Sequence, residues 1–399
     1  MRISGLWKRK NLIAAAILLL AIAAIFAAQC ALTGVKPGSY TYPSYLLQAQ
    51  AWLRGDLALD RNYEYLELAV YEGRYYVSFP PVPSIPMVLW TLIWGNDVPG
   101  GLFQKIYIAI TAIAVFSALR CRERVRTADC VAWSLFICLG SSMLPIALKG
   151  AVWYEAQIMA FTFSVSAIAA MVRGRPTLSC LLYALSVGCR PFSVLLGPVL
   201  LALYLRRESG RDLRGKIVRL IPGLAVGLCV AAGYAAFNYV RFGSIFEFGH
   251  NYLPEFTRAE HGQFSLTYIA NNWRTLFFGR PFTTDGATIT FNQFGFSMFL
   301  SNPILICLLV WAASDIARRQ FTRQKLLILL MCALNVFFLL MHRTLGGYQF
   351  GLRYALELVP LCLAYLLFSP ERTRLTRWEC AVMCFGLAFN FLGGCLVHI

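Results

Sequence analysis

GRYYVSFPPVPSIPMVLW, residues 73–90, is the stretch on which the fold of this chain depends. It is apolar enough to enter a membrane, yet four prolines fall within seven residues, at Pro80, Pro81, Pro83 and Pro86. Proline lacks the N–H that a helix interior uses, and lipid supplies no substitute partner. We therefore expect an interfacial or shallowly re-entrant element over 73–95, which walls a cavity at the membrane surface.

The rest of the chain has the composition of a polytopic membrane protein. It has 399 residues, of which 58% are hydrophobic, and its mean hydropathy is +0.61. These values exclude an ordinary soluble domain. Apolar runs near the ~20 residues that cross a ~30 Å hydrocarbon core predict an all-α fold of about eleven spans, at 11–32, 102–119, 128–147, 154–172, 176–189, 191–205, 217–240, 294–317, 326–341, 353–369 and 378–396.

The charge pattern gives these spans an orientation. The net charge is +17, and most basic residues recur in clusters between the runs, such as RCRERVR at 120–126. The positive-inside rule places these clusters and the N-terminus in the cytoplasm. A span over 79–95 would break this alternation, and the scattered clusters argue against a nucleic-acid surface. Residues 1–399 then form one membrane domain with two long outer segments, 33–101 and 241–293, that carry interfacial helices.

The sequence gives no sign of a metal or cofactor. The 13 cysteines lie mostly inside apolar runs, and no CxxC or Cys/His spacing occurs. No DxD pair appears in the outer segments either. We expect no structural metal and no obligatory cofactor, and a loosely bound divalent cation stays open.

Arg190 stands at an unusual place. The runs 176–189 and 191–205 are each near 21 Å long as helices, which is shorter than the hydrocarbon core. Arg190 between them is expected below the outer interface, where an arginine is costly unless it faces water or an anion. We expect it to bind a lipid phosphate. The alternative is that it snorkels to the interface or pairs with a carboxylate such as Glu155.

Three blocks carry a family resemblance: residues 73–90, then NYVRFGSIFEFGHNY at 238–252, then GGYQFGLRYALELVP at 346–360. In order and position they resemble blocks of bacterial GT-C membrane glycosyltransferases, of the family 39-like and mannosyltransferase-like kinds, which use polyprenyl-phosphate sugars. The resemblance implies about a dozen spans, with short outer helices covering the active site. It also implies an acidic base in the first outer loop and basic residues that hold the donor phosphate.

The residues that match these roles are candidates. Many relatives have an acid just after the first span, but this chain has no Asp or Glu between 36 and 52. Glu67 is our first choice for the base and Asp56 the second, and the alternative for both is a solvated loop carboxylate. Glu155, at the outer start of the fourth span, is the third candidate. The candidates for holding phosphate are Lys149, Arg190, Arg241 and Arg353, which alternatively anchor lipid headgroups. The candidates for the cavity wall are Tyr75, Tyr76, Pro80 and Pro81.

The sequence therefore predicts an inverting glycosyltransferase at the outer face of a bacterial cytoplasmic membrane. Its donor is expected to be a polyprenyl-phosphate sugar and its acceptor an envelope glycan, lipid or protein, with membrane lipids around it. A transporter or flippase of a lipid-linked glycan stays open, and so does a catalytically silent scaffold. We treat His250 and His342 as structural, and we expect an amphipathic helix over 264–278.

Overall fold

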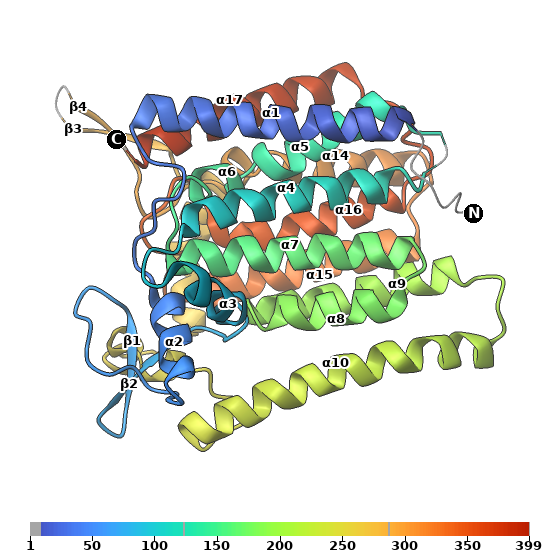
Figure 1. Ribbon diagram of the computed structural model, residues 1–399. Helices are drawn as coiled ribbons and strands as arrows, with labels where there is room; N and C mark the ends of the chain where they lie inside the picture. The colour runs from blue at the N-terminus through green and yellow to red at the C-terminus, as the bar shows by residue number, and fades with distance from the viewer. Residues whose placement is uncertain (1–8, 123, 286–287, 399) are drawn as a thin grey trace.

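The computed structural model describes residues 9–122, 124–285 and 288–398. Its helices lie side by side in one bundle (Figure 1). Six of them have the length and apolarity to cross a membrane, so the chain is a multi-pass membrane protein. They are α1 (Arg9–Thr33), α4 (Gly100–Leu119), α7 (Val152–Val172), α10 (Leu213–Phe242), α15 (Arg323–Met341) and α17 (Arg377–Leu396).

Shorter helices complete the bundle, and several follow a break. They are α5 (Thr127–Leu139), α6 (Met143–Ile146), α8 (Pro176–Val187), α9 (Gly197–Arg207), α14 (Ile304–Ala317) and α16 (Val359–Leu367). The 3₁₀ turns η1 (Pro191–Leu196) and η4 (Arg353–Leu358) lead directly into α9 and α16. The core includes α16, where every residue is buried, whereas α10 lies at the edge and packs on α8 (Figure 1).

Six of the eleven predicted spans coincide with the long helices, and the other five are short or interrupted. The predicted span 128–147 breaks after Gly140, and 294–317 breaks at Asn302–Pro303. The span 353–369 begins as a 3₁₀ turn, because Pro360 follows in the first turn of α16. A count of apolar residues does not detect these breaks. Within the described residues the eleven predicted spans are therefore not eleven continuous helices.

Two long segments and a short one gather at one end of the bundle (Figure 1). We call it the loop end, and its described residues are 34–99, 243–285, 288–301 and 342–352. The first segment holds α2 (Ser44–Leu53), β1 (Leu68–Tyr71), β2 (Arg74–Val77) and α3 (Ser84–Trp94). The second holds η2 (His250–Tyr252), α11 (Pro254–Thr257), η3 (Leu266–Tyr268), α12 (Ile269–Phe278), β3 (Phe282–Asp285), β4 (Thr288–Phe291) and α13 (Met298–Ser301). The opposite end is called the basic end.

The all-α prediction is wrong at the loop end, because two β hairpins occur there. In the first, β1 pairs antiparallel with β2, with Leu68 opposite Val77. Glu72 and Gly73 in its turn both have positive φ, at 50° and 72°, the geometry of a tight two-residue hairpin turn. In the second, Phe282 lies opposite Phe291. The residues Glu72 and Gly73 are a local indication of a turn, but averaging hydropathy over windows as long as a membrane span does not detect it.

The proline-rich stretch forms no membrane crossing. After β2 the chain turns at residues 78–83, where Val82 N–H donates to Gly188 O at 3.1 Å, and α3 begins. Eleven residues give α3 a length of about 16 Å, half of a hydrocarbon core. Its exposed side chains are nevertheless apolar, among them Leu89, Leu92 and Ile93. The predicted helix over 264–278 is also present, as η3 and α12.

Candidate functional site

The main cavity lies at the loop end and has a volume of about 370 Å³. The start of α7, the end of α15, the segment 246–251 and the beginning of η4 enclose it. Its wall is largely aromatic, and polar groups gather on part of it. The aromatic members include Phe79, Trp153, Phe192, Phe246, Phe264 and Tyr354, and the polar members are Arg190, Glu247, His250, Asn251, Gln263, His342 and Arg353. An apolar wall with a few convergent polar groups is typical of a ligand site.

Two arginines from distant parts of the chain meet in this cavity. The Arg190 guanidinium carbon lies 4.5 Å from the centre of the Tyr354 ring, and that of Arg353 lies 4.7 Å from the same centre. Both contacts are within the range of cation–π attraction. Tyr354 therefore contacts the guanidinium groups of both arginines.

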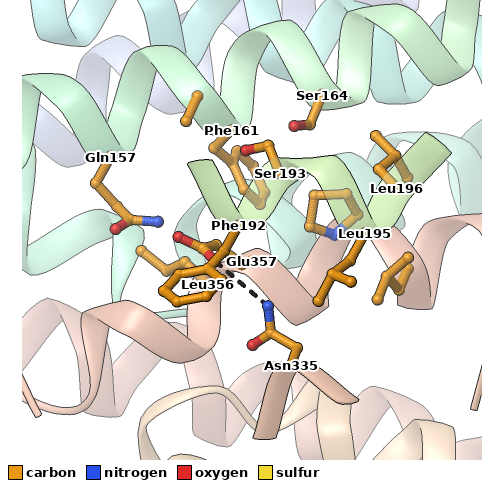
Figure 2. Close-up of a pocket in the computed structure, with 13 residues that line it drawn as sticks. Gln157, Phe161, Ser164, Phe192, Ser193, Leu195, Leu196, Asn335, Leu356 and Glu357 are labelled. Atoms are coloured by element: carbon orange, nitrogen blue, oxygen red, sulfur yellow. Dashed lines mark hydrogen bonds between the residues drawn. The ribbon is translucent and has the colours of Figure 1, made fainter. Parts of the chain in front are cut away.

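Arg190 has a carboxylate partner. Its Nε lies 2.7 Å from Glu357 Oε1, and both side chains are largely buried. Asn335 Nδ2 donates to the other oxygen of Glu357 at 3.3 Å, as the dashed line in Figure 2 shows. The carboxylate is thus Glu357 in η4, and not Glu155, the example that the sequence suggested. Its charge largely neutralises that of Arg190.

A small void of about 20 Å³ lies beside this pair, between α7, η1 and α15 (Figure 2). Gln157 Oε1 and Asn335 Oδ1 are buried near it without a hydrogen-bond partner in the described chain. The void is large enough for about one water molecule. The surroundings of Glu357 are therefore partly polar and closely packed.

Arg353, in contrast, has no carboxylate partner within the described residues. It is 3% exposed, and its Nη1 makes one long hydrogen bond of 3.4 Å, to Trp153 O, while Nε has no partner. A buried guanidinium without a counter-ion is electrostatically costly, and such groups mark sites that bind anions or line water-filled cavities. Arg353 is the group best placed in the cavity to receive an anionic ligand.

The backbone before Arg353 fixes this position. Gly346 and Gly351 have φ of 112° and 92°, values that side-chain-bearing residues rarely adopt. A Cβ on Gly351 would also lie 2.5 Å from the Cβ of Ser301. Between the two glycines, Gln349 Oε1 accepts the Arg353 backbone N–H at 2.9 Å. The GGYQFG sequence thus makes a rigid loop that ends at the arginine.

An adjoining cavity of about 280 Å³ shares Trp153 and Arg353 with the main cavity. Glu67 and Lys149 line it, together with the tyrosines Tyr42, Tyr154 and Tyr348. Arg353 and Trp153 therefore form the partition between the two cavities. A ligand that extends from the main cavity into the adjoining one is therefore within reach of the Arg353 guanidinium and the Glu67 carboxylate.

Glu67 stands directly before β1 and is held by one hydrogen bond. Trp153 Nε1 donates to Glu67 Oε2 at 2.8 Å. Its other oxygen, Oε1, accepts no hydrogen bond from the described residues, and the side chain is exposed. One oxygen is thus oriented by the indole, and the second is available to accept a proton.

Two neutral histidines border the main cavity. His250 Nδ1 lies 2.6 Å from Ser78 O, which can only accept, so Nδ1 carries the proton. His342 has Nδ1 at 2.6 Å from Thr344 O and Nε2 at 3.1 Å from the Gln263 amide. Burial lowers the pKa of both, that of His342 to about 4, with the nearby arginines acting in the same direction. At neutral pH the arginines supply the positive charge of the cavity.

No protein-family model and no curated protein matches this chain. Solved structures match its fold. The oligosaccharyltransferase of Archaeoglobus fulgidus in the apo form aligns with a TM-score of 0.53 over 96% of this chain and 56% of its own, at 14% identity. AglB of the same organism, in complex with an inhibitory peptide and a dolichol-phosphate, aligns with a TM-score of 0.53 over 95% and 56%, at 13% identity.

The chain has the GT-C fold. It spans a little more than half of the length of the oligosaccharyltransferases that it matches. ArnT from Cupriavidus metallidurans bound to undecaprenyl phosphate is also similar, with a TM-score of 0.47 over 94% of this chain and 62% of that one, at 13% identity. The two oligosaccharyltransferase matches confirm the predicted GT-C resemblance at the level of fold.

Within this GT-C fold the other acidic candidates lie apart from both cavities. Asp56 follows α2 and is exposed, and it lines neither of them. Glu155, in the first turn of α7, is buried and accepts a hydrogen bond of 2.8 Å from Tyr40 Oη. Glu155 thus ties the segment after α1 to α7. Glu67 is the one predicted base candidate that lines a cavity described above.

Of the remaining predicted residues, Lys149 and Pro80 line a cavity and four do not. Arg241 is buried at the end of α10, where its Nη1 donates to Val77 O at 3.1 Å and its guanidinium packs on Phe237. Tyr76 packs on Phe242 behind the hairpin. Tyr75 and Pro81 do not line the main cavity, whose wall at this point is formed by Phe79 and Pro80.

Sequence reasoning overlooked two acids of the cavity region, Glu357 and Glu247. Both lie within blocks that carried the resemblance, so their position was the available signal. Glu247 accepts the Gly249 backbone N–H at 2.5 Å and the Asn251 amide at 2.6 Å, so both oxygens are engaged in its own loop. Among the described residues no group of three or more His, Cys, Asp or Glu side chains is arranged to hold a metal ion.

Proposed function

We propose that this protein is a GT-C glycosyltransferase that takes a sugar from a polyprenyl-phosphate donor and transfers it to a hydroxyl of a cell-envelope acceptor. The observation that carries the proposal is Arg353, a buried guanidinium without a carboxylate partner in the described chain, between an aromatic cavity and a cavity that contains Glu67. Guanidinium groups bind phosphate oxygens in bidentate fashion. The fold, shared with an oligosaccharyltransferase, supports the same reading.

In this proposal the donor phosphate occupies the main cavity against Arg353, with Arg190 behind Tyr354 adding positive potential. The acceptor enters the adjoining cavity. Its hydroxyl proton passes to Glu67 Oε1 while the hydroxyl oxygen bonds to the anomeric carbon from the side opposite the phosphate. The bond between the anomeric carbon and the phosphate oxygen breaks, and polyprenyl phosphate leaves with the bonding electrons. A single displacement of this kind inverts the anomeric configuration.

Two contributions to the rate are expected, one from the base and one from the cations. A positioned general base contributes about 10²–10⁴-fold to rate. Preorganised positive groups that stabilise the departing phosphate act strongly in a site from which water is excluded. Lys149, in the same cavity as Glu67, adds a second cation on the acceptor side. The proposal needs no metal ion in the reaction.

We place this activity at the outer face of a bacterial cytoplasmic membrane. The support is the concentration of arginine and lysine in the links at the basic end, which the positive-inside rule assigns to the cytoplasm. The loop end, with both cavities, then faces outward. A transporter of a lipid-linked glycan is the second candidate class. It is less well supported, because the unpaired cation and Glu67 lie at one end of the bundle and not at its middle.

The test is sugar transfer by the purified protein in nanodiscs, with a panel of radiolabelled polyprenyl-phosphate sugars and an envelope extract as acceptor. Glu67→Gln is expected to lower transfer by about 10²-fold or more while the protein stays folded. Glu64→Gln is the matched control, an exposed acid of the same segment that lines neither cavity, and it should transfer at the wild-type rate. Binding of donor without transfer by the wild type would overturn the proposal and favour the transporter or scaffold.

A further inference from the structure

A third cavity, of about 490 Å³, lies at the basic end of the bundle. Four helices end around it, namely α4, α7, α9 and α16. Four arginines line it, two in the link after α4 and two at the end of α9: Arg122, Arg124, Arg206 and Arg207. The rest of the wall includes the apolar side chains Val125, Val172, Leu203 and Leu367. We call it the arginine pocket.

Two of these arginines donate hydrogen bonds to backbone carbonyls at the end of α16 and in the link that follows it. Arg122 Nη2 donates to Ser369 O and to Arg372 O, both at 2.6 Å. Arg206 Nη1 donates to Leu367 O at 3.0 Å and its guanidinium lies 5.2 Å from the Phe368 ring. The Arg122 guanidinium is partly removed from water, and this burial lowers its pKa to about 10. These carbonyls orient the two groups but carry only partial negative charge.

Carboxylates near the pocket are engaged elsewhere. Glu208 pairs with Arg211 and Arg219, and Glu371 pairs with Lys325. Within the described chain, which leaves out Glu123, none of the four pocket arginines forms an ion pair, and Arg124 and Arg207 make no side-chain hydrogen bond. The pocket therefore concentrates four positive charges around a space of ligand size.

Membrane topology alone does not require this arrangement. The positive-inside rule needs basic residues in a link, and it is satisfied by exposed side chains such as those at 318–323. A cavity with a partly buried guanidinium and an apolar wall is an additional feature. Arginine clusters of this kind match the geometry of phosphate oxygens.

We propose that the arginine pocket binds a phosphate group, brought either by the headgroup of an anionic lipid, whose acyl chains would follow the apolar wall, or by a soluble phosphate ester. The pocket lies at the opposite end of the bundle from Glu67 and Arg353, so this site is separate from the proposed reaction. Anionic lipid is attracted to basic clusters at membrane surfaces by about 1 kcal/mol per arginine or lysine, which is close to a five-fold change in affinity for each.

The experiment uses the whole purified protein in phosphatidylcholine nanodiscs. In one arm the discs contain a low fraction of phosphatidylglycerol, and native mass spectrometry counts the anionic lipid that stays bound. In the other arm inorganic pyrophosphate is titrated and its binding is followed by calorimetry. The test variant is Arg124→Gln with Arg207→Gln, because neither side chain has a described partner whose loss would harm the fold. The control is Arg318→Gln with Arg323→Gln, which removes the same charge at the same end from exposed positions outside the pocket.

We expect the test variant to lose binding in one arm by about 30-fold, which is two losses of about five-fold. The control variant should lose far less, because its arginines lie outside the pocket. Loss confined to the lipid arm assigns the phosphate to a lipid, and loss confined to the pyrophosphate arm assigns it to a soluble ligand. Equal losses in the test and control variants would mean that general surface charge is responsible, and the proposal fails. It also fails if the wild type binds in neither arm.

Discussion

Two buried cations at opposite ends of the bundle, Lys325 and Arg353, lie in opposite electrostatic environments. At the basic end, Lys325 is 1% exposed and lies 2.8 Å from Asp315 and 2.9 Å from Glu371. Arg372 pairs with the other oxygen of Asp315 at 2.5 Å, and Tyr365 donates to Asp315 at 2.7 Å. At the loop end, Arg353 is buried to a similar degree but has no carboxylate beside it in the described chain.

This difference separates architecture from binding. A buried cation that is fully paired stabilises the folded state as long as all partners remain, and it has no capacity left for a ligand. A buried cation without a partner lowers stability until an anion arrives. The comparison predicts that substitutions at the two ends affect different properties, in the order of size that follows.

The largest effect is expected from Lys325→Met. It leaves the buried Asp315 with Arg372 as its one described cation and removes the ammonium partner of Glu371, so the protein should lose about 3–5 kcal/mol of stability. The check is the denaturant or thermal midpoint of the purified protein in detergent. Arg323→Met, at an exposed position two residues earlier, is the control and should change little. A midpoint unchanged in Lys325→Met would show that the network contributes no net stability and would break the comparison.

Arg353→Gln should reverse the pattern. Transfer from a polyprenyl-phosphate sugar is expected to fall by about 10²–10³-fold, because one group that stabilises the departing phosphate is lost. The thermal midpoint should stay the same or rise, since no ion pair in the described chain is broken. Both quantities are measured on one preparation. A strong loss of stability would indicate that Arg353 is structural, as Lys325 is.

His342 tests whether the loop end can accept more positive charge. Its pKa is lowered to about 4, chiefly by burial and further by the arginines, against about 6.5 in the unfolded chain. Because the pKa of His342 is lower in the folded protein, its contribution to the free energy of unfolding is fully present above pH 6.5. This contribution is lost as the pH falls through about 4. The loss amounts to about 3 kcal/mol.

His342→Asn can keep the hydrogen bond to Thr344 O without the titration. It should therefore flatten the fall in thermal midpoint between pH 6.5 and 4. Wild-type and variant curves that run parallel over this range would show that another group is responsible. His261, an exposed histidine of the second loop-end segment, offers the matched control as His261→Asn.

The smallest effect is expected from Trp153→Phe. It removes the 2.8 Å hydrogen bond that orients Glu67 but keeps an aromatic side chain in the partition. We expect kcat to fall by about ten-fold, with KM little changed, as for the loss of a hydrogen bond of about 1.4 kcal/mol to a carboxylate. A change in KM alone would show that the indole acts by shaping the cavity.

Turn chemistry and hydropathy explain which parts of the fold were predictable. The six long helices are continuous apolar runs, and each lies where the sequence predicts a span. The runs that contain Pro303 and Pro360 break into pieces, because proline cannot continue the backbone hydrogen bonding of the helix before it. The hairpin at Glu72–Gly73 was overlooked because four-residue strands give little periodic signal.

The sequence by itself determined that this is a membrane bundle with basic links at one end, and that the proline-rich stretch does not span. These properties depend on the local composition and on the fact that proline has no backbone N–H, and neither changes with the surroundings. Only the tertiary structure decided the partners. Arg190 meets Glu357 across 167 positions and Glu67 meets Trp153 across 86. Such pairs form because the packing of helices and loops brings distant residues together, so one arginine is neutralised and Arg353 is left for a ligand.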